Sequence, residues 1–325
     1  MNISVIFTGG TIGSVQKEAW VGIDDATQYT LLQPFEKKYK DVCFKTGAPY
    51  SILSENLSAS ELNLLQEELD GVLKNKPDGI IITHGTDTIQ YTAAAIEFAY
   101  GNVDIPVVFV SADYPLEDPA SNGYINFEAA VEFIRKGTCK GIYVSYKNED
   151  TSYVDIHVAS RLLQHGERSA NLYSLDNCVC AVYEQEVKVL SCVESVPAPS
   201  VAPVTYIQDA GILTVESRPG NYYGYALNGV RAILLKPYHS ATLNTDSEAF
   251  VEFCKKAAAL QIPIFIANVP KGEQYESSKY FDDLGICVAP YSTYVSLYMK
   301  LWRGISLGAD LKESVMKPIC HEICS

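Results

Sequence analysis

Two short segments combine glycine with hydroxyl side chains directly after apolar runs. In Thr8–Gly13 (TGGTIG) two glycines precede Thr11. In Thr83–Thr88 (THGTDT) one glycine precedes Thr86 and Asp87. A threonine hydroxyl attacks a carbonyl carbon once a base removes its proton. Glycines let the backbone approach a substrate closely, so that main-chain N–H groups can stabilise an oxyanion. Together the segments predict a pocket for threonine chemistry.

Each segment also has a structural explanation. A glycine-rich turn with a capping threonine, or a phosphate-binding loop, accounts for the first segment. It is not a Walker loop, because no Gly-Lys-Ser/Thr follows, and it is not the dinucleotide fingerprint, because Gly9 and Gly10 are adjacent. Asp87 at the start of a helix would satisfy free N–H groups. Two such turns at two strand ends nevertheless favour a buried polar pocket.

Short apolar runs alternate with helical patterns and must position these turns. Strands that are apolar throughout and separated by helices are typical of a parallel sheet covered on both faces. In such a sheet, ligands bind outside the carboxyl ends of the strands, where both turns fall. The expected strands are residues 3–7, 79–83, 106–110 and 141–146, and the expected helices are residues 58–73, 88–100 and 126–136.

A proline-rich segment divides the chain. Three prolines within residues 195–203 favour an extended connector. We therefore expect an α/β protein in which a larger, doubly wound, parallel-sheet domain (1–194) carries most of the site. A linker (195–204) then leads to a smaller α/β domain (205–325). The strands expected in this second domain are residues 232–235 and 263–267, and the helices are residues 247–260 and 292–304.

The charge of the chain limits its partners. The 325 residues include 25 Lys and Arg against 39 Asp and Glu, a formal net charge of −14. Nucleic acids and anionic membranes need basic patches, so neither is expected as the main partner. No basic segment precedes the first apolar run, and no apolar run is long enough to span a bilayer. A cytoplasmic protein is expected.

The cysteines do not form a recognisable framework. Their number, 9, is odd and they are scattered, which favours reduced thiols. Cys178 and Cys180 lie close together, as do Cys320, His321 and Cys324. Neither group has a partner pair at the spacing of a zinc site. The sequence therefore predicts no metal, and no cofactor is expected.

The two threonine segments resemble those of the bacterial-type L-asparaginase family, in which a TGGTI segment supplies the attacking threonine and an HGTDT segment a second threonine and an aspartate. The resemblance covers nearly the whole chain and indicates a divergent, cytoplasmic type I-like member. It implies hydrolysis of the side-chain amide of L-asparagine to L-aspartate and ammonia. The supporting segments are Ser54–Leu57, Val110–Pro115, Ser121–Asn126, Val230–Leu234, His239–Asn244 and Ala267–Gly272.

The resemblance implies a role for each site residue. Thr11 attacks the amide carbon, while Thr86 and Asp87 assist proton transfer. Asp87 also faces the substrate α-ammonium. Ser54 and its neighbour Glu55 are implied in binding the substrate α-carboxylate and α-ammonium. The backbone at Ala112 faces the amide. The glycines Gly10 and Gly85 are also implied in substrate binding.

The position that holds a catalytic lysine in the family carries His157 here, when the chains are aligned through Val158–Leu162. His157 could act as the base, because a neutral imidazole accepts a proton near physiological pH. Lys147 could reach the site from a nearby loop. Alternatively, this second triad is disabled, leaving a weak enzyme or a sensor. We favour His157 as the replacement.

The resemblance also implies a lid over the substrate and the partners of the chain. In relatives, a mobile segment after the first threonine carries a tyrosine and closes over the substrate. The corresponding segment here is residues 15–30, and the closing aromatic is Trp20 or Tyr29.

Because relatives are dimers or dimers of dimers, a homodimer or homotetramer is expected. The partner is a small-molecule amide. The alternatives are a glutaminase, another amide hydrolase, or a weakened amino-acid-binding or regulatory protein.

Overall fold

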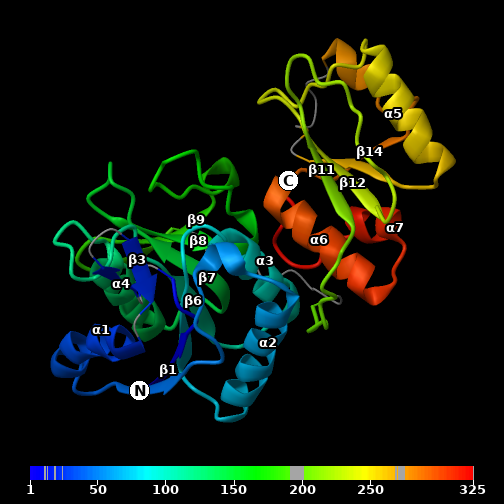
Figure 1. Ribbon diagram of the computed structural model, residues 1–325. Helices are drawn as coiled ribbons and strands as arrows, with labels where there is room; N and C mark the ends of the chain where they lie inside the picture. Colours follow the sequence, from blue (N-terminus) through cyan, green and yellow to red (C-terminus); the bar gives the residue numbers. More distant parts are fainter. Residues whose placement is uncertain are drawn as a thin grey trace. The chain divides into compact units, whose positions relative to one another are not determined.

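A computed structural model describes residues 1–10, 12, 14–17, 20–23, 25–190, 201–267, 269 and 275–324; of residues 14–17, 20–23 and 25–29 it describes the secondary structure only. The chain divides into two compact units, shown in Figure 1. Unit 1 comprises Met1–Thr205 and Ile319–His321, and unit 2 comprises Tyr206–Pro318 and Glu322–Ser325. The predicted linker at 195–204 stays a prediction, because residues 191–200 lie outside the described residues.

Unit 1 contains an eight-stranded sheet of order β10-β9-β8-β7-β6-β5-β1-β4. Five strands are parallel and three are antiparallel. This mainly parallel sheet confirms the predicted α/β fold class. The parallel strands are β1 (Asn2–Phe7), β4 (Cys43–Gly47), β5 (Gly79–Thr83), β6 (Pro106–Val110) and β7 (Gly141–Tyr146). The antiparallel strands are β8 (Val154–Val158), β9 (Val179–Tyr183) and β10 (Val187–Val189).

Helices cover both faces of this sheet, as Figure 1 shows. Alternate residues of a strand point to opposite faces, so Val5 packs with α1 (Asp25–Lys38) and α4 (Gly123–Lys136). Ile6 packs on the other face with α2 (Ala59–Lys74) and α3 (Ile89–Tyr100). Burial on both faces explains why these strands are apolar throughout.

Local signals explain where the helices begin and end. Ser58 caps α2 in a capping box with Glu61. The helix α4 begins at Gly123, three residues before its predicted start, and it ends at Lys136, where Gly137 is the C-cap with a φ of 63°. The segment after the first threonine turn forms a short hairpin of β2 (Ser14–Lys17) and β3 (Trp20–Ile23).

Unit 2 contains a parallel four-stranded sheet of order β11-β12-β13-β14. The strands are β11 (Ile212–Glu216), β12 (Ala232–Lys236), β13 (Ile264–Ile266) and β14 (Ile286–Val288), and the helices are α5 (Glu248–Ala259), α6 (Tyr294–Leu307) and α7 (Leu311–Met316). Short 3-10 helices are η2 (Ser54–Asn56), η3 (Ala159–Arg161), η4 (Leu175–Asn177) and η5 (Glu276–Tyr280). Among the described residues, no helix is both long and apolar enough to cross a membrane.

Candidate active site

The strand order of unit 1 reverses between β1 and β5. From β1 the sheet continues to β4 on one side and to β5, β6 and β7 on the other. Loops on either side of such a reversal leave the sheet in opposite directions and open a crevice at the carboxyl ends of the strands. The two glycine–threonine turns follow β1 and β5. The candidate site therefore lies where this fold usually binds ligands.

The two turns contact each other through their glycines. Gly9 and Gly10 have φ angles of +97° and +79°, a region that favours glycine. A Cβ added to Gly10 would overlap the main-chain N and Cα of Gly85. A Cβ added to Gly85 would lie 2.5 Å from Oγ of Ser54. Three of the predicted binding residues are thus brought together, with no room for a methyl group between them.

Hydrogen bonds hold this contact in place. The Gly10 N–H donates to the Ile52 carbonyl (3.0 Å), and the Ile52 N–H donates to the Thr8 carbonyl (3.1 Å). The Thr8 hydroxyl donates to the Thr83 carbonyl (2.6 Å) and so joins the ends of β1 and β5. On the other side, the Thr88 hydroxyl donates to the Ser54 carbonyl (2.8 Å). The turns and η2 therefore form one connected frame.

The side chains around this frame differ in exposure. Ser54 is buried, Thr86 is half-buried, and Asp87 and Glu55 are exposed. Two carboxylates thus face solvent beside a buried hydroxyl, an arrangement that suits a substrate carrying an ammonium group. Thr11, the predicted nucleophile, lies outside the described residues.

For the two lid candidates, the structure describes only the secondary-structure element in which each lies. Trp20 is the first residue of β3, and Tyr29 lies within α1. The side chains of both lie outside the described part of the chain. Their assignment as closing aromatics stays a prediction.

The loop after β6 is tied to the same frame. Ser111 Oγ donates to the His84 carbonyl (2.7 Å), and the Asn126 amide donates to the Ser111 carbonyl (2.9 Å). Ala112 is fully buried, and a Cβ added to Gly123 would lie 3.0 Å from its methyl group. The Ala112 side chain is therefore packed away from solvent, and the role predicted for its backbone stays a prediction.

His84 supports the second turn. It is almost fully buried, and burial lowers its pKa to about 4. The imidazole is therefore neutral at physiological pH, and its Nδ1 lies 2.8 Å from the Gly85 carbonyl oxygen. Since a carbonyl oxygen only accepts, Nδ1 carries the proton. This hydrogen bond fixes the orientation of the Gly85 peptide.

His157 lies on β8, on the sheet face that packs against α2 and α3. It is opposite Val144 of β7 and is almost fully buried. Burial lowers its pKa to about 4. Its Nδ1 lies 3.1 Å from Ser174 Oγ, and within the described residues its Nε2 has no hydrogen-bond partner. The ring is therefore oriented at one nitrogen, while the other remains available to accept a proton.

Lys147, the alternative to His157, directly follows β7 at the carboxyl edge of the sheet. Its N–H donates to Asn126 Oδ1 (2.8 Å), and its carbonyl accepts from the Asn122 amide (2.9 Å). Its ammonium lies 3.5 Å from the Asn148 carbonyl. Among the hydrogen bonds of the described residues, none joins either His157 or Lys147 to Thr86.

The structure adds one residue that sequence reasoning missed. His165 lies in the loop after η3, with its ring 6.1 Å from that of Tyr146. Burial lowers its pKa, and the charge of nearby Asp87 opposes this shift. Next to it, Gln164 accepts a hydrogen bond from Tyr91 of α3 (2.6 Å). No motif marks His165, because its proximity to Asp87 arises only when the loop folds onto α3.

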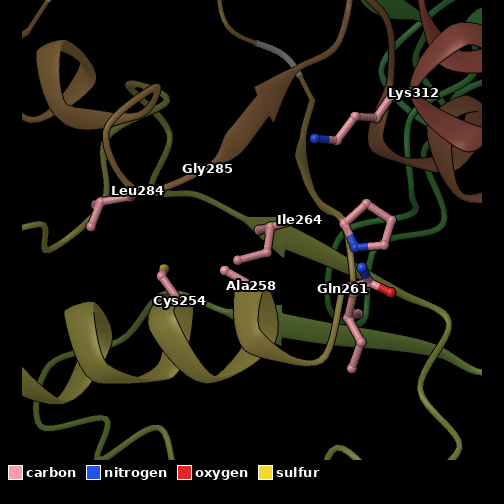
Figure 2. A pocket seen from close by; sticks show the side chains of 9 residues that line it. Cys254, Ala258, Gln261, Ile264, Leu284, Gly285 and Lys312 are labelled. Carbon is pink, nitrogen blue, oxygen red and sulfur yellow. The ribbon is translucent and has the colours of Figure 1, made fainter.

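Unit 2 has a separate hollow, shown in Figure 2. This cavity of about 300 Å³ lies between the end of α5 and the amino ends of β13 and β14. Cys254 points into it from α5, and Lys312 extends toward it from the other side. Burial raises the pKa of Cys254 to about 12, so this thiol is not a nucleophile at neutral pH. The cavity lacks the acid–base groups of the candidate site.

Comparisons with known proteins indicate the family of this chain. Residues 2–189 match the family described as "Asparaginase, N-terminal". The chain is 30% identical over 161 residues to a glutamyl-tRNA(Gln) amidotransferase subunit from Methanosphaera stadtmanae, covering 49% of this chain and 36% of that protein. The corresponding protein of Methanococcus vannielii is 30% identical over 179 residues, and this match covers 54% of this chain and 42% of that protein. The chain thus spans less than half the length of these relatives.

Solved structures resemble the whole chain. The L-asparaginase from Thermococcus kodakarensis superimposes with a TM-score of 0.82 at 22% identity, covering 100% of both chains. L-asparaginase I from Vibrio cholerae has a TM-score of 0.80 at 19% identity, covering 100% of this chain and 99% of the other. At these identities the likeness concerns the fold.

The glycine contact can be tested by adding one methyl group. We expect Gly10→Ala to lower the free energy of unfolding by at least about 2 kcal/mol, since it adds steric overlap to backbone strain. Gly71 lies exposed within α2 with no atom within 4 Å of an added Cβ. Gly71→Ala is the matched control and should stabilise the chain by roughly 0.5–1 kcal/mol. Denaturant unfolding measures the free energy of unfolding of both variants. Equal changes in Gly10→Ala and Gly71→Ala would contradict the close contact of Gly10 with Gly85.

Burial of His84 and His157 predicts acid sensitivity. Both pKa values fall from 6.5 to about 4 on folding, so between these pH values the unfolded chain binds more protons. Stability is therefore complete above pH 6.5 and is lost as the pH falls toward 4, by about 3 kcal/mol for each histidine. Substitution His157→Gln should reduce the slope of unfolding free energy against pH by up to about 1.4 kcal/mol per pH unit.

The slope is measured by denaturant unfolding between pH 4.5 and 6. Substitution His239→Gln, which changes an exposed imidazole, is the matched control. An unchanged slope in His157→Gln would show that the buried ring does not govern acid sensitivity.

Proposed function

Because this chain belongs to the asparaginase family, we propose that it is an amidohydrolase that converts L-asparagine to L-aspartate and ammonia. The observation that carries the proposal is the contact of Gly10, Gly85 and Ser54 at the strand reversal. It joins the two threonine turns into one frame. The proposed nucleophile is Thr11, and the reaction requires no cofactor.

The proposed reaction has two halves. The Thr11 hydroxyl adds to the amide carbon while its proton passes to a base, and main-chain N–H groups stabilise the oxyanion. The carbon–nitrogen bond then breaks, and the nitrogen takes up a proton and leaves as ammonia. Water adds to the resulting ester, which releases the carboxylate and regenerates the Thr11 hydroxyl. Thr86 and Asp87 assist the proton transfers.

Substrate binding follows from the charges of the frame. The exposed carboxylates of Asp87 and Glu55 suit the α-ammonium, and the buried Ser54 hydroxyl suits the α-carboxylate. The backbone at Ala112 faces the amide. Pocket depth then separates asparagine from glutamine, which is one methylene longer and differs in binding by only about 1–3 kcal/mol.

A second candidate function comes from the relatives named as subunits of an amidotransferase. Their likeness of 30% over about half of this chain favours an amide-hydrolysing subunit that releases ammonia from glutamine for a second protein. This candidate implies a partner chain. The first candidate implies a cytoplasmic homodimer or homotetramer acting on a free amino acid.

For the base we propose His157. Its Nε2 is available within the described residues, and Ser174 orients its other nitrogen. With a pKa of about 4, the ring is entirely in its accepting form at neutral pH. It is also a weak base, which reduces the driving force for proton transfer and predicts slow turnover. Lys147 and His165 are the competing groups.

Ammonia release tests the reaction. The chain should release ammonia from asparagine, and Thr11→Ala should reduce kcat/KM at least roughly 1,000-fold, because the nucleophile is lost. Thr138→Ala, which changes an exposed threonine, is the control and should match the unaltered chain. Glutamine and short amide peptides are assayed alongside.

Other outcomes of the ammonia assay would favour the alternative functions. Faster release from glutamine would favour the amidotransferase-like candidate. Thermal stabilisation by asparagine without ammonia would favour an amino-acid-binding protein. An unaffected Thr11→Ala would remove the proposed nucleophile.

Three substitutions identify the base. We expect His157→Gln to lower kcat/KM by roughly 100- to 10,000-fold, the usual contribution of general base catalysis, and Lys147→Met and His165→Asn to have smaller effects. The profile of kcat/KM against pH should lose activity as the pH falls through about 4, where His157 takes up a proton. A larger loss in Lys147→Met, with His157→Gln fully active, would assign the role to Lys147.

A further inference from the structure

Three metal-binding side chains meet in unit 1, away from the threonine turns. Glu97 lies on α3, and Cys320 and His321 belong to the C-terminal residues that are part of the same unit. Glu97 Oε1 lies 2.7 Å from His321 Nδ1, which lies 3.1 Å from Cys320 Sγ. All three ligand atoms lie within 4.8 Å of one another. A carboxylate, an imidazole and a thiol thus share one small space.

The surroundings of these groups fix their orientation. The second oxygen of Glu97 accepts a hydrogen bond from the Ser160 N–H. The carbonyl of His321 accepts from Arg161 Nε (2.6 Å), which holds the backbone that carries both C-terminal ligands. Metal sites usually have such outer hydrogen bonds, because they keep the ligands aimed at the ion.

Burial separates the three ligands from bulk solvent. Glu97 and Cys320 are 1% and 3% exposed, whereas the His321 side chain is 11% exposed. A Cβ on Gly101 would overlap the Cys320 sulfur, so glycine at this position leaves space for the thiol. The cluster is therefore closed on the side of α3 and more open at His321, where an ion can enter and keep a water ligand.

We propose that Glu97, Cys320 and His321 bind a zinc ion, with water as the fourth ligand. Thiolate, imidazole and carboxylate are all zinc ligands, and the mixture of soft and borderline donors favours zinc over magnesium or calcium. One ionised thiol and one carboxylate balance the two positive charges of Zn²⁺. The loaded site is therefore neutral, which limits the cost of burying the ion.

The geometry needs only a small adjustment. A tetrahedral zinc ion with ligand bonds of about 2.0–2.3 Å places sulfur and nitrogen about 3.6 Å apart, and oxygen and nitrogen about 3.4 Å apart. The present separations of 3.1 Å and 2.7 Å are shorter by about half an ångström. In the absence of the ion, the Glu97–His321 contact satisfies the buried carboxylate.

The sequence alone predicted no metal, because neither Cys178–Cys180 nor Cys320–Cys324 has a second ligand pair at the spacing of a zinc site. The carboxylate that completes the cluster lies 224 positions from His321 along the chain. Only the folded unit brings α3 and the C-terminal residues together. The bound ion would link Cys320 and His321 to α3, and the site is independent of the proposed amidase reaction.

Zinc titration of the chelator-treated, full-length chain tests this site. Competition with a chromophoric chelator should show one zinc ion per chain, and Co²⁺ in its place should give a thiolate-to-cobalt charge-transfer band. Loss of an outer hydrogen bond typically weakens metal binding about 10- to 100-fold, so loss of a ligand in Cys320→Ser should weaken it at least about 100-fold. His321→Gln should behave in the same way.

The matched control is Cys324→Ser, which changes another buried cysteine of the C-terminal segment that is not part of the cluster. It should bind zinc like the unaltered chain. Zinc should also raise the Tm of the unaltered chain and of Cys324→Ser, but not that of Cys320→Ser. Absence of tight zinc binding in the unaltered chain, or equal affinity in Cys320→Ser, would overturn the proposal and leave only the Glu97–His321 contact.

Discussion

The candidate site depends on a steric constraint, the approach of the Gly10 and Gly85 backbones. Neither position has space for a Cβ, and Gly10 also has a φ that other residues adopt with strain. The approach holds the two threonine turns against each other at the strand reversal. Every other feature of the site, from the Ser54 hydroxyl to the anchored loop after β6, lies around this contact.

Buried polar side chains make the frame rigid. Asn126 connects two loops, because its amide donates to the Ser111 carbonyl and its oxygen accepts from the Lys147 N–H. Ser145 Oγ donates to the Asn126 carbonyl (2.8 Å) from within β7. Buried polar groups are stable only when paired, so such a network permits one arrangement of the loops rather than several. A reaction that depends on oriented N–H groups benefits from this restriction.

The sequence predicted the central strands and the two turns because each leaves a local pattern. Strands β1, β5, β6 and β7 are buried on both faces and are therefore continuous apolar runs. The edge strand β4 was missed, since most of its side chains are exposed and its sequence, CFKTG, shows no apolar run. Helix α1 contains Pro34 and has a weak apolar stripe, so its pattern was also hidden.

The site was only partly predictable for a different reason. Motifs indicated Ser54, Gly10 and Gly85, whose contact the structure describes. The environment of a titratable group, by contrast, depends on elements distant in the chain. His157 was expected to titrate like an ordinary imidazole, but packing on the α3 side lowers its pKa to about 4. The proximity of His165 to Asp87 likewise depends on how one loop folds.

The return of Ile319–His321 to unit 1 affects how the chain folds during synthesis. The ribosome makes most of unit 1 first, but the residues that contact Glu97 follow the main segment of unit 2. At 5–20 residues per second, the delay between Thr205 and His321 is roughly ten seconds. Throughout that interval the Glu97 carboxylate lacks its contact with His321, so this part of unit 1 is completed only after the main segment of unit 2 has been made. A nascent chain stalled before Ile319 would therefore leave the end of α3 around Glu97 and Gly101 without these contacts.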